Sequence, residues 1–205
     1  MTGYRVVNLK IFIEELGEDA AKSILSNFSC PLNPDVEYFL SRKAMEFSQH
    51  GWAQTHLVFA SYKEEWVLVG YFALANKYIR ISAKKLGKAS GSLRRRIAKF
   101  ATYDSSLKSY ILAAPLIAQL GKNYKAGYDK LITGDELLSE ACNKIRKLQF
   151  DIGGKFAYIE CEDKAKLTDF YERNGFCEFD IRYLDRDETD KLEGDYLVQM
   201  LKYIK

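Results

Sequence analysis

Apolar positions along this chain recur with two periods, one typical of helices and one typical of strands. The helical period predicts helices over 18–28, 33–51, from 134 to about 148, and over 163–175. Segments rich in β-branched and aromatic residues predict strands over 6–12, 55–62, 66–75, 78–81, 109–120, 156–161, 177–184 and 196–204. The strands at 55–62 and 66–75 are separated by a polar turn and are expected to form an antiparallel hairpin, and the acidic residues 185–195 are interpreted as a turn. Helices and strands are mixed along the whole chain, which favours a single mixed α/β domain.

Two of these helices carry residues that are typical of helix ends. Asn33 followed by Pro34 predicts an N-cap and a first helical residue, and Gly51 predicts the end of the same helix. Thr133, with Glu136 three residues later, predicts a capping box at the start of another helix. Glu136 is therefore expected to have a structural role.

Composition narrows the class of protein. The 205 residues are 47% hydrophobic and 14% aromatic, which supports a packed core and argues against disorder. No apolar run approaches the roughly 18 residues that a membrane span needs, and the first residues lack the apolar region of a signal peptide. We therefore expect a cytoplasmic protein without membrane association. Its four cysteines are scattered and it has two histidines, so neither a metal site nor a disulfide framework is predicted.

Positive charge is concentrated in one segment, residues 77–108. This segment holds ten Lys or Arg residues against the single acid Asp104, which gives it a charge of +9 in a chain whose net charge is +3. Its part at 82–108 is interpreted as an insertion on the surface. The cations could form a solvated surface, assist a phosphate of a cofactor, receive an acidic acceptor, or bind nucleic acid through its phosphates.

The last predicted helix ends in Phe170-Tyr171-Glu-Arg-Asn-Gly175-Phe176 and follows the strand at 157–161. This segment resembles the FYxxxGF segment of the GCN5-related N-acetyltransferase (GNAT) superfamily. The strand at 116–120 and the segment 132–138 resemble that superfamily's acetyl-CoA-binding strand and helix start. The resemblance implies a mixed α/β (α+β) fold with a central twisted, mostly antiparallel sheet, splayed at the acetyl-CoA site, and helices on both faces. The resemblance covers roughly residues 5–204 and is specific over 114–176; the expected single domain spans residues 1–205.

The resemblance also implies an activity, the transfer of an acetyl group from acetyl-CoA to an acceptor amine by direct attack. The resemblance implies that Tyr171 protonates the departing CoA thiolate, whereas its spacing alone fits a core aromatic better. A helix N-terminus suits the CoA pyrophosphate because it presents unpaired N–H groups. The implied cofactor-binding residues are Leu120, Gly121, Lys122, Lys130, Leu131, Ile132, Thr133, Gly134 and Asp135.

The segment that would bind acetyl-CoA departs from the family pattern. Residues 122–131 are interpreted as a polar loop. The family's glycine two residues before Gly134 is Ile132 here, and its arginine or glutamine at the loop start falls on Asp129. No general base stands out: the candidate carboxylates are Glu46, Glu160 and Glu162, and His56 fits a packed histidine better than a base. An α-amine, with a pKa of about 7.7–8.0, needs less help from a base than a lysine amine.

The acceptor remains open between a small amine, a peptide and aminoacyl-tRNA. The segment Gly70-Tyr-Phe-Ala-Leu-Ala75, followed by Arg94, Arg95 and Arg96, resembles acetyltransferase toxins of the superfamily that modify the amino acid on charged tRNA. That resemblance implies tRNA as a partner. The alternative is a non-catalytic module on the same fold that binds CoA, a nucleotide or a protein. The apolar segment 196–204 could support a homodimer.

Overall fold

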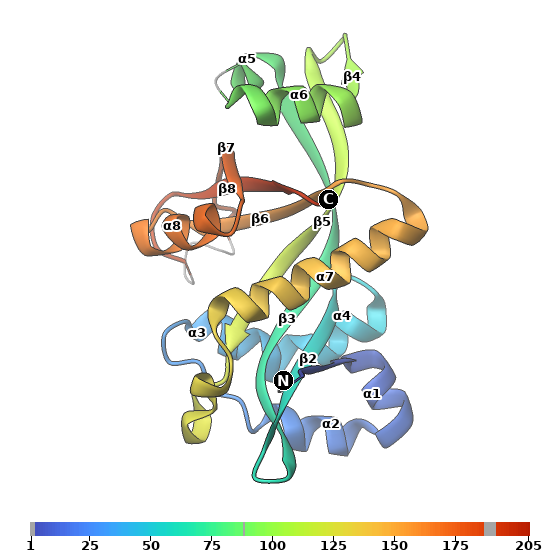
Figure 1. Cartoon of the computed structure of the whole chain (residues 1–205), viewed down its shortest axis with the longest axis vertical. Coiled ribbons are helices and arrows are strands. Elements are labelled where there is room, and N and C mark those ends of the chain that lie inside the picture. Colours follow the sequence, from blue (N-terminus) through green and yellow to red (C-terminus); the bar gives the residue numbers. More distant parts are fainter. Residues whose placement is uncertain (1–2, 88, 187–191) are drawn as a thin grey trace. The chain divides into compact units, whose positions relative to one another are not determined.

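The computed structural model describes residues 3–87, 89–186 and 192–205. These residues form two compact units (Figure 1). The first contains Met1–Ala75 and Ile117–Asn143, and the second contains Asn76–Leu116 and Lys144–Lys205. β3, β5 and α7 contribute residues to both units.

The first unit begins with four α-helices and three strands. In chain order its elements are β1 (Arg5–Asn8), α1 (Leu9–Leu16), α2 (Glu18–Leu25), α3 (Pro34–Tyr38), a π-helical turn (Phe39–Lys43), α4 (Ala44–His50), β2 (Gln54–Tyr62) and the first part of β3 (Glu65–Ser82). The end of β5 (Ser109–Lys122), a 3-10 segment η2 (Lys125–Leu131) and the start of α7 (Gly134–Ile152) complete it.

The second unit holds the end of β3, the first part of β5, the end of α7 and the remaining elements. These are α5 (Ala83–Leu86), α6 (Gly91–Phe100), β4 (Thr102–Asp104), β6 (Phe156–Glu162), α8 (Ala165–Arg173), β7 (Cys177–Tyr183) and β8 (Tyr196–Tyr203). The predicted turn at 185–195 lies partly outside the described residues, which omit 187–191.

The eight strands of the described chain are mostly antiparallel. They follow the order β1-β2-β3-β5-β6-β8-β7, with β4 paired to β5. β1 pairs with β2, β2 with β3, β6 with β8, and β7 with β8, all antiparallel, whereas β5 and β6 are parallel and pair Leu116 with Tyr158. The predicted mixed, mostly antiparallel sheet is confirmed.

The predicted strand at 6–12 is wrong beyond Asn8. Asn8 is the N-cap of α1, and its side-chain oxygen accepts hydrogen bonds from the backbone N–H groups of Lys10 (2.9 Å) and Ile11 (3.3 Å). Leu9 and Phe12, three residues apart, are both buried, as one face of a helix requires. The cap therefore overrides the weak alternation that suggested a strand.

The predicted helix at 33–51 and the predicted hairpin are both present. The side chain of Asn33 caps α3 with Pro34 in its first turn, and Gly51 ends α4 with a left-handed φ of 74°. Between β2 and β3, Lys63 and Glu64 have positive φ angles of 50° and 68°, which suits a tight hairpin turn. The separate strand predicted at 78–81 is the continuation of β3.

Each unit has its own apolar core. In the first unit, α1 to α4 lie beside β2 and β3 (Figure 1), and Leu9, Leu40, Leu57 and Tyr71 are among the fully buried residues. In the second unit the predicted basic insertion is anchored through α6. Leu93 and Ile97 are buried in the core with Ile81 and Tyr158, whereas the arginines of α6 are exposed. This segment therefore contains a packed helix, α6, with a cationic outer face.

No helix among the described residues has the length and apolarity that a membrane crossing requires. The four cysteines form no disulfide: Cys30, Cys142 and Cys161 are buried and Cys177 is exposed.

Gly121 is required by packing in the first unit. A Cβ added to it would lie 2.3 Å from Cγ1 of Val36 on α3, and the branched valine side chain has no flexible end that could move aside. We expect Gly121→Ala to lower the free energy of unfolding by about 2 kcal/mol or more, the cost typical of overpacking a core. Urea denaturation measures this loss.

Gly91→Ala is the matched control for this substitution. Gly91 is the first residue of α6, and a Cβ there would meet no atom within 4 Å. Alanine favours the helix more than glycine does, so this variant should unfold at the same or a slightly higher urea concentration. Equal destabilisation by both variants would contradict the packing argument.

Candidate functional site

The segment that follows β5 in the first unit is more ordered than the predicted polar loop. Residues Lys125–Leu131 form a 3-10 segment with a kink at Ala126 and Gly127, whose φ angles are 54° and 77°. The ammonium group of Lys122 donates hydrogen bonds to the backbone carbonyls of Asp129 (2.8 Å) and Ile132 (3.2 Å). Lys122 therefore ties the end of β5 to the far end of this segment, and the predicted polar loop contains a 3-10 segment.

Asn123 holds the start of the same segment, and no pattern in the sequence indicated this role. Its side chain is fully buried and makes four hydrogen bonds. The amide oxygen accepts from the backbone N–H groups of Ser29 and Lys125, both at 3.0 Å. The amide nitrogen donates to the carbonyls of Asn27 (2.7 Å) and Leu68 (2.8 Å). One side chain thus joins three separate stretches of backbone.

The start of α7 has the predicted capping box. The Glu136 carboxylate accepts hydrogen bonds from the backbone N–H (2.7 Å) and the hydroxyl (2.8 Å) of Thr133, and the Thr133 hydroxyl oxygen accepts from the Glu136 N–H (3.1 Å). The hydrogen bond from the Thr133 N–H is the main cause that lowers the pKa of Glu136. The N–H of Gly134 has no hydrogen-bond partner among the described residues. The carboxylate therefore lies where an anionic ligand would approach the helix.

The predicted cofactor-binding residues differ in exposure. Gly121 and Ile132 are buried, and the side chain of Ile132, at 2% exposure, belongs to the core. The others are half-buried (Leu120, Lys122, Leu131, Gly134) or exposed (Lys130, Thr133, Asp135). All nine lie in the first unit, whereas Tyr171 belongs to the second. Ile132 thus contributes packing where the family pattern has a glycine.

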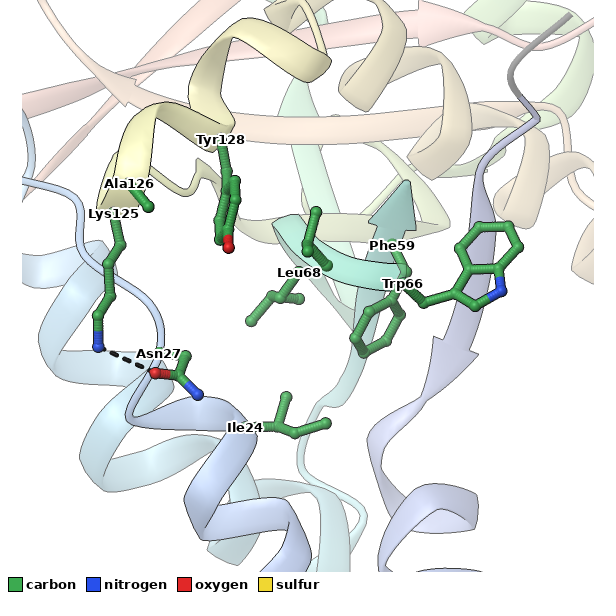
Figure 2. A pocket seen from close by; sticks show the side chains of 9 residues that line it. Ile24, Asn27, Phe59, Trp66, Leu68, Lys125, Ala126 and Tyr128 are labelled. Atoms are coloured by element: carbon green, nitrogen blue, oxygen red, sulfur yellow. Dashed lines mark hydrogen bonds between the residues drawn. The ribbon is translucent and has the colours of Figure 1, made fainter. Parts of the chain in front are cut away.

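A cavity of about 250 Å³ lies beside η2 in the first unit (Figure 2). Its walls come from α2, the β2–β3 hairpin and η2, and they are lined by Ile24, Asn27, Phe59, Trp66, Val67, Leu68, Lys125, Ala126 and Tyr128. The ammonium group of Lys125 donates to the side-chain oxygen of Asn27 (2.9 Å) and to the carbonyl of Ser26 (3.3 Å). None of the predicted cofactor-binding residues lines this cavity.

In the second unit, Tyr171 lies near the end of α8. Its ring contacts Phe170 (4.9 Å between centroids) and Phe176 (5.7 Å), both edge to face. The N–H of Phe176 donates a hydrogen bond to the Tyr171 carbonyl (3.0 Å), and the N–H of Gly175 donates one to the Glu172 carbonyl (2.8 Å). Gly175 has a left-handed φ of 82°. The end of α8 is therefore a Schellman motif. Burial raises the pKa of Tyr171 above its usual value, and the nearby Cys161 thiol raises it further.

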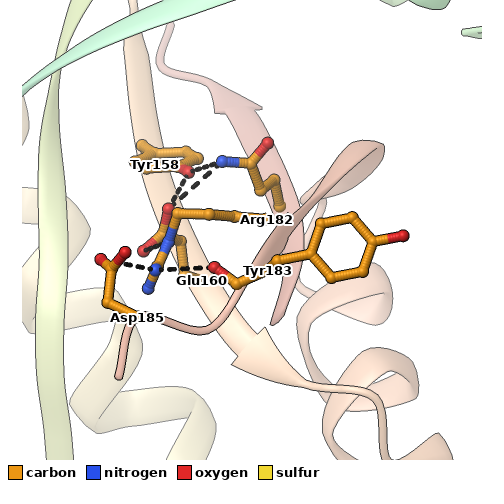
Figure 3. Close-up of polar contacts among 6 residues, drawn as sticks. Tyr158, Glu160, Arg182, Tyr183 and Asp185 are labelled. Atoms are coloured by element: carbon orange, nitrogen blue, oxygen red, sulfur yellow. Dashed lines mark hydrogen bonds and ion pairs between the residues drawn. The ribbon is translucent and has the colours of Figure 1, made fainter. Parts of the chain in front are cut away.

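The candidate base Glu160 is held in a hydrogen-bonded network on β6, β7 and β8 (Figure 3). One carboxylate oxygen accepts from the Tyr158 hydroxyl (2.5 Å) and the Gln199 amide (3.2 Å), and the other accepts from the Arg182 Nε (3.0 Å). Arg182 also forms an ion pair with Asp185 (3.5 Å). Burial is the main cause that raises the pKa of Tyr158 well above its usual range, followed by its bond to Glu160. These contacts give Glu160 a structural role.

The remaining candidate bases differ in their surroundings. Glu162 forms an ion pair with Lys164 (3.1 Å) and accepts from a backbone N–H, while Glu46 is exposed on α4. His56 is buried on β2 and stacks on Phe72 with ring centroids 4.9 Å apart, as expected for a packed histidine.

Comparisons with known proteins identify the fold. No protein-family model matches the chain, and no curated protein matches it. Solved structures of AtaT do match. A Tyr-to-Phe mutant of the AtaT toxin has a TM-score of 0.61 at 14% identity, and the match covers 98% of this chain and 89% of that one. AtaT complexed with acetyl-methionyl-tRNAfMet has a TM-score of 0.58 at 15% identity, with 96% and 94% covered.

A third structure is the AtaT mutant bound to acetyl-CoA and to the C-terminus of the antitoxin AtaR. It has a TM-score of 0.57 at 14% identity, and the match covers 98% of this chain and 92% of that one. At these identities the likeness shows the fold, and it extends over nearly the whole chain.

Proposed function

We propose that this chain, which has the GNAT fold, transfers the acetyl group of acetyl-CoA to an amine. The observation that carries the proposal is the match of nearly the whole chain to an acetyl-CoA-bound structure of that fold. Two local features support it. α7 begins with the N–H of Gly134 directed to no partner among the described residues, and α8 carries Tyr171 in the FYxxxGF segment.

Binding of acetyl-CoA is proposed along the end of β5 and the start of α7. The backbone at Leu120, Gly121 and Lys122 pairs with the pantetheine arm in the manner of an added strand. The segment 130–135 holds the pyrophosphate, because the positive end of the α7 dipole favours an anion there. Lys122 places a positive charge beside this segment, because its ammonium group donates hydrogen bonds to the carbonyls of Asp129 and Ile132.

The proposed reaction has a single bond exchange. The acceptor nitrogen attacks the thioester carbonyl carbon, the C–S bond breaks, and the CoA sulfur leaves with the electron pair. Tyr171 gives its hydroxyl proton to that sulfur, and the amine loses its own proton to solvent. The Tyr171 phenolate then takes a proton from solvent, which restores the phenol. Because the pKa of Tyr171 is raised by burial, its hydroxyl is protonated throughout the neutral range.

The acceptor is proposed to be the α-amine of an aminoacyl-tRNA. The carboxylate of Glu160 accepts three hydrogen bonds from the described residues and is therefore not available as a general base. An α-amine, with a pKa of about 7.7–8.0, needs such a base less than a lysine amine does and is the better acceptor. The exposed Arg94, Arg95 and Arg96 supply cations for RNA phosphates. The AtaT complex with acetyl-methionyl-tRNAfMet supports the same substrate class.

Titration calorimetry with acetyl-CoA tests the proposal first. Saturable binding, followed by consumption of acetyl-CoA when charged tRNA is added, is the expected result. If the chain binds acetyl-CoA but consumes it only with a small amine, the tRNA part of the proposal fails. If acetyl-CoA does not bind at all, the chain is a non-catalytic member of this fold.

Glu136 gives a sharper test of the pyrophosphate site. Gln can close the same capping box without the negative charge, so Glu136→Gln should leave the unfolding free energy within about 1 kcal/mol. Removing the carboxylate from the start of α7 should tighten acetyl-CoA binding about threefold at low salt, the size of a helix-terminus charge effect. Calorimetry at two salt concentrations measures it. An unchanged affinity would place the pyrophosphate elsewhere.

A further inference from the structure

A second hollow, of about 480 Å³, lies in the second unit and is not used by the proposed reaction. It is bounded by the end of α6, by β5, by the end of α7 and by the turn that leads to β6. Its lining residues are Phe100, Leu112, Ala113, Gln149, Phe150, Gly153, Gly154, Lys155 and Phe156. Its size falls within the range of small-ligand sites.

Aromatic rings lie open to solvent at this hollow. Phe150 is 91% exposed and Phe100 is 41% exposed. Phe100 is held in place by Phe156 (6.4 Å between ring centroids) and Tyr203 (5.8 Å). A phenylalanine exposed to this degree buries almost none of its apolar surface in the fold, so a folding role does not account for it. A flat partner could stack on it.

The charged side chain that lines the hollow is a cation. Its nine lining residues include Lys155 and no carboxylate. The neighbouring α6 adds Arg94, Arg95, Arg96 and Lys99, all exposed. In the described part of the chain none of these five cations forms an ion pair. The guanidinium group of Arg96 is held 4.6 Å above the ring of Tyr203, where stacking orients it without neutralising it.

Exposed aromatic rings beside unpaired cations match the needs of single-stranded nucleic acid. Every base has a face that can stack on an aromatic ring, and its phosphate carries the charge that lysine and arginine bind. An uncharged lipid surface or an apolar protein partner would not require the row of cations. A duplex would offer phosphates but would keep its bases stacked inside.

We propose that this hollow binds one unpaired nucleotide of an RNA partner, with the base against Phe150 and Phe100 and the phosphate beside Lys155 and the cations of α6. The inference deepens the proposed function and rests on it for the identity of the RNA, because the end of a charged tRNA that carries the amino acid is single-stranded. The chemistry of the hollow itself requires only an unpaired nucleotide.

A six-nucleotide, fluorescein-labelled single-stranded RNA is the probe, and fluorescence anisotropy with the full chain is the measurement. Phe150→Ala is expected to raise Kd about tenfold, the loss typical of one base–aromatic stack, without changing the slope of log Kd against log salt. Phe150→Tyr keeps a ring and should stay within about twofold of the original chain. Because Phe150 is almost fully exposed, neither substitution should disturb folding.

Two further variants separate charge from stacking. Lys155→Ala should reduce the salt slope by about one, as expected for the loss of one phosphate contact. Ile152→Ala is the matched control: Ile152 is 69% exposed on the same helix end but does not line the hollow, so its Kd should be unchanged. Equal losses at Ile152 and Phe150, or equal binding of duplex RNA, would overturn the proposal.

Light scattering on the same variants tests a protein partner. If Phe150→Ala halves the molar mass and leaves the RNA affinity unchanged, this face joins two copies of the chain and the proposal is wrong. Acetyl-CoA calorimetry keeps the two proposals apart. If RNA binding depends on Phe150 but acetyl-CoA does not bind, the proposed transferase activity is refuted and the nucleotide site is retained. If acetyl-CoA binds but RNA binding does not depend on Phe150, only the transferase proposal is retained.

Discussion

Replacing Tyr171 by Phe is expected to lower acetyl-transfer turnover by about 100-fold or more, the contribution typical of a positioned general acid. The substitution removes one hydroxyl and keeps the ring, so the contacts with Phe170 and Phe176 remain. Acetyl-CoA affinity should stay within about twofold, because the acid acts when the C–S bond breaks and not when the cofactor binds.

Steady-state kinetics and calorimetry on the same preparation separate these two effects. Tyr183→Phe is the matched control: Tyr183 lies on β7 of the same unit, is 70% exposed, and should tolerate the same chemical change without loss of turnover. Turnover that survives in Tyr171→Phe would reduce Tyr171 to a core aromatic, the other interpretation of its position on α8.

The pH dependence of turnover gives a second readout of the same residue. Burial shifts the pKa of Tyr171 upward, so the phenol is in its acidic, protonated form at all pH values below its usual pKa of about 10. Tyr171 should therefore cause no fall in turnover between about pH 7 and pH 9. A fall centred within that range that persists in Tyr171→Phe would identify a different titrating group.

The largest expected effect on stability comes from Asn123→Asp, with a loss of about 3–5 kcal/mol at pH 7, the range for an uncompensated buried charge. The substitution hardly changes the shape of the side chain. It replaces the amide nitrogen, which donates to the carbonyls of Asn27 and Leu68, by an oxygen that cannot donate. Both carbonyls then lose their partner, and a negative charge faces them in a fully buried position.

This loss should depend on pH in a defined direction. Burial next to two carbonyl oxygens raises the pKa of the new carboxyl above its value in the unfolded chain. Folding then opposes ionisation, so the destabilisation is small at low pH, where the group is protonated in both states. It grows as the pH rises above the unfolded pKa of about 3.9. Urea titrations at about pH 4 and pH 7 would show the difference.

Asn8→Asp is the matched control for Asn123. The side-chain oxygen of Asn8 accepts hydrogen bonds from the N–H groups of Lys10 and Ile11 at the start of α1, and an aspartate can accept both. Asp and Asn cap helices about equally well, so this variant should lose less than about 1 kcal/mol. Similar losses at both positions would show that the bonds of Asn123 are not what holds the three backbone stretches together.

Elements whose signals are local could be predicted from the amino-acid sequence. Asn33 with Pro34, Thr133 with Glu136, and Gly175 with Phe176 each act within about one helical turn, so their caps could be predicted from spacing. Apolar periodicity likewise predicted the β2–β3 hairpin and the mixed sheet. The same local signals carried the resemblance to the GNAT superfamily, and the fold is confirmed.

Contacts between residues far apart in the chain could not be predicted in this way. Asn123 joins backbone 96 residues away, and Glu160 is held by Arg182 from a different strand. Lys122 donates a hydrogen bond to the carbonyl of Asp129 and so joins the end of β5 to the 3-10 segment. The rings and cations of the second hollow come from α6, α7 and the turn before β6. Hydrogen bonds and charges act over a few ångströms in space regardless of sequence separation, so only the folded chain shows which of these groups meet.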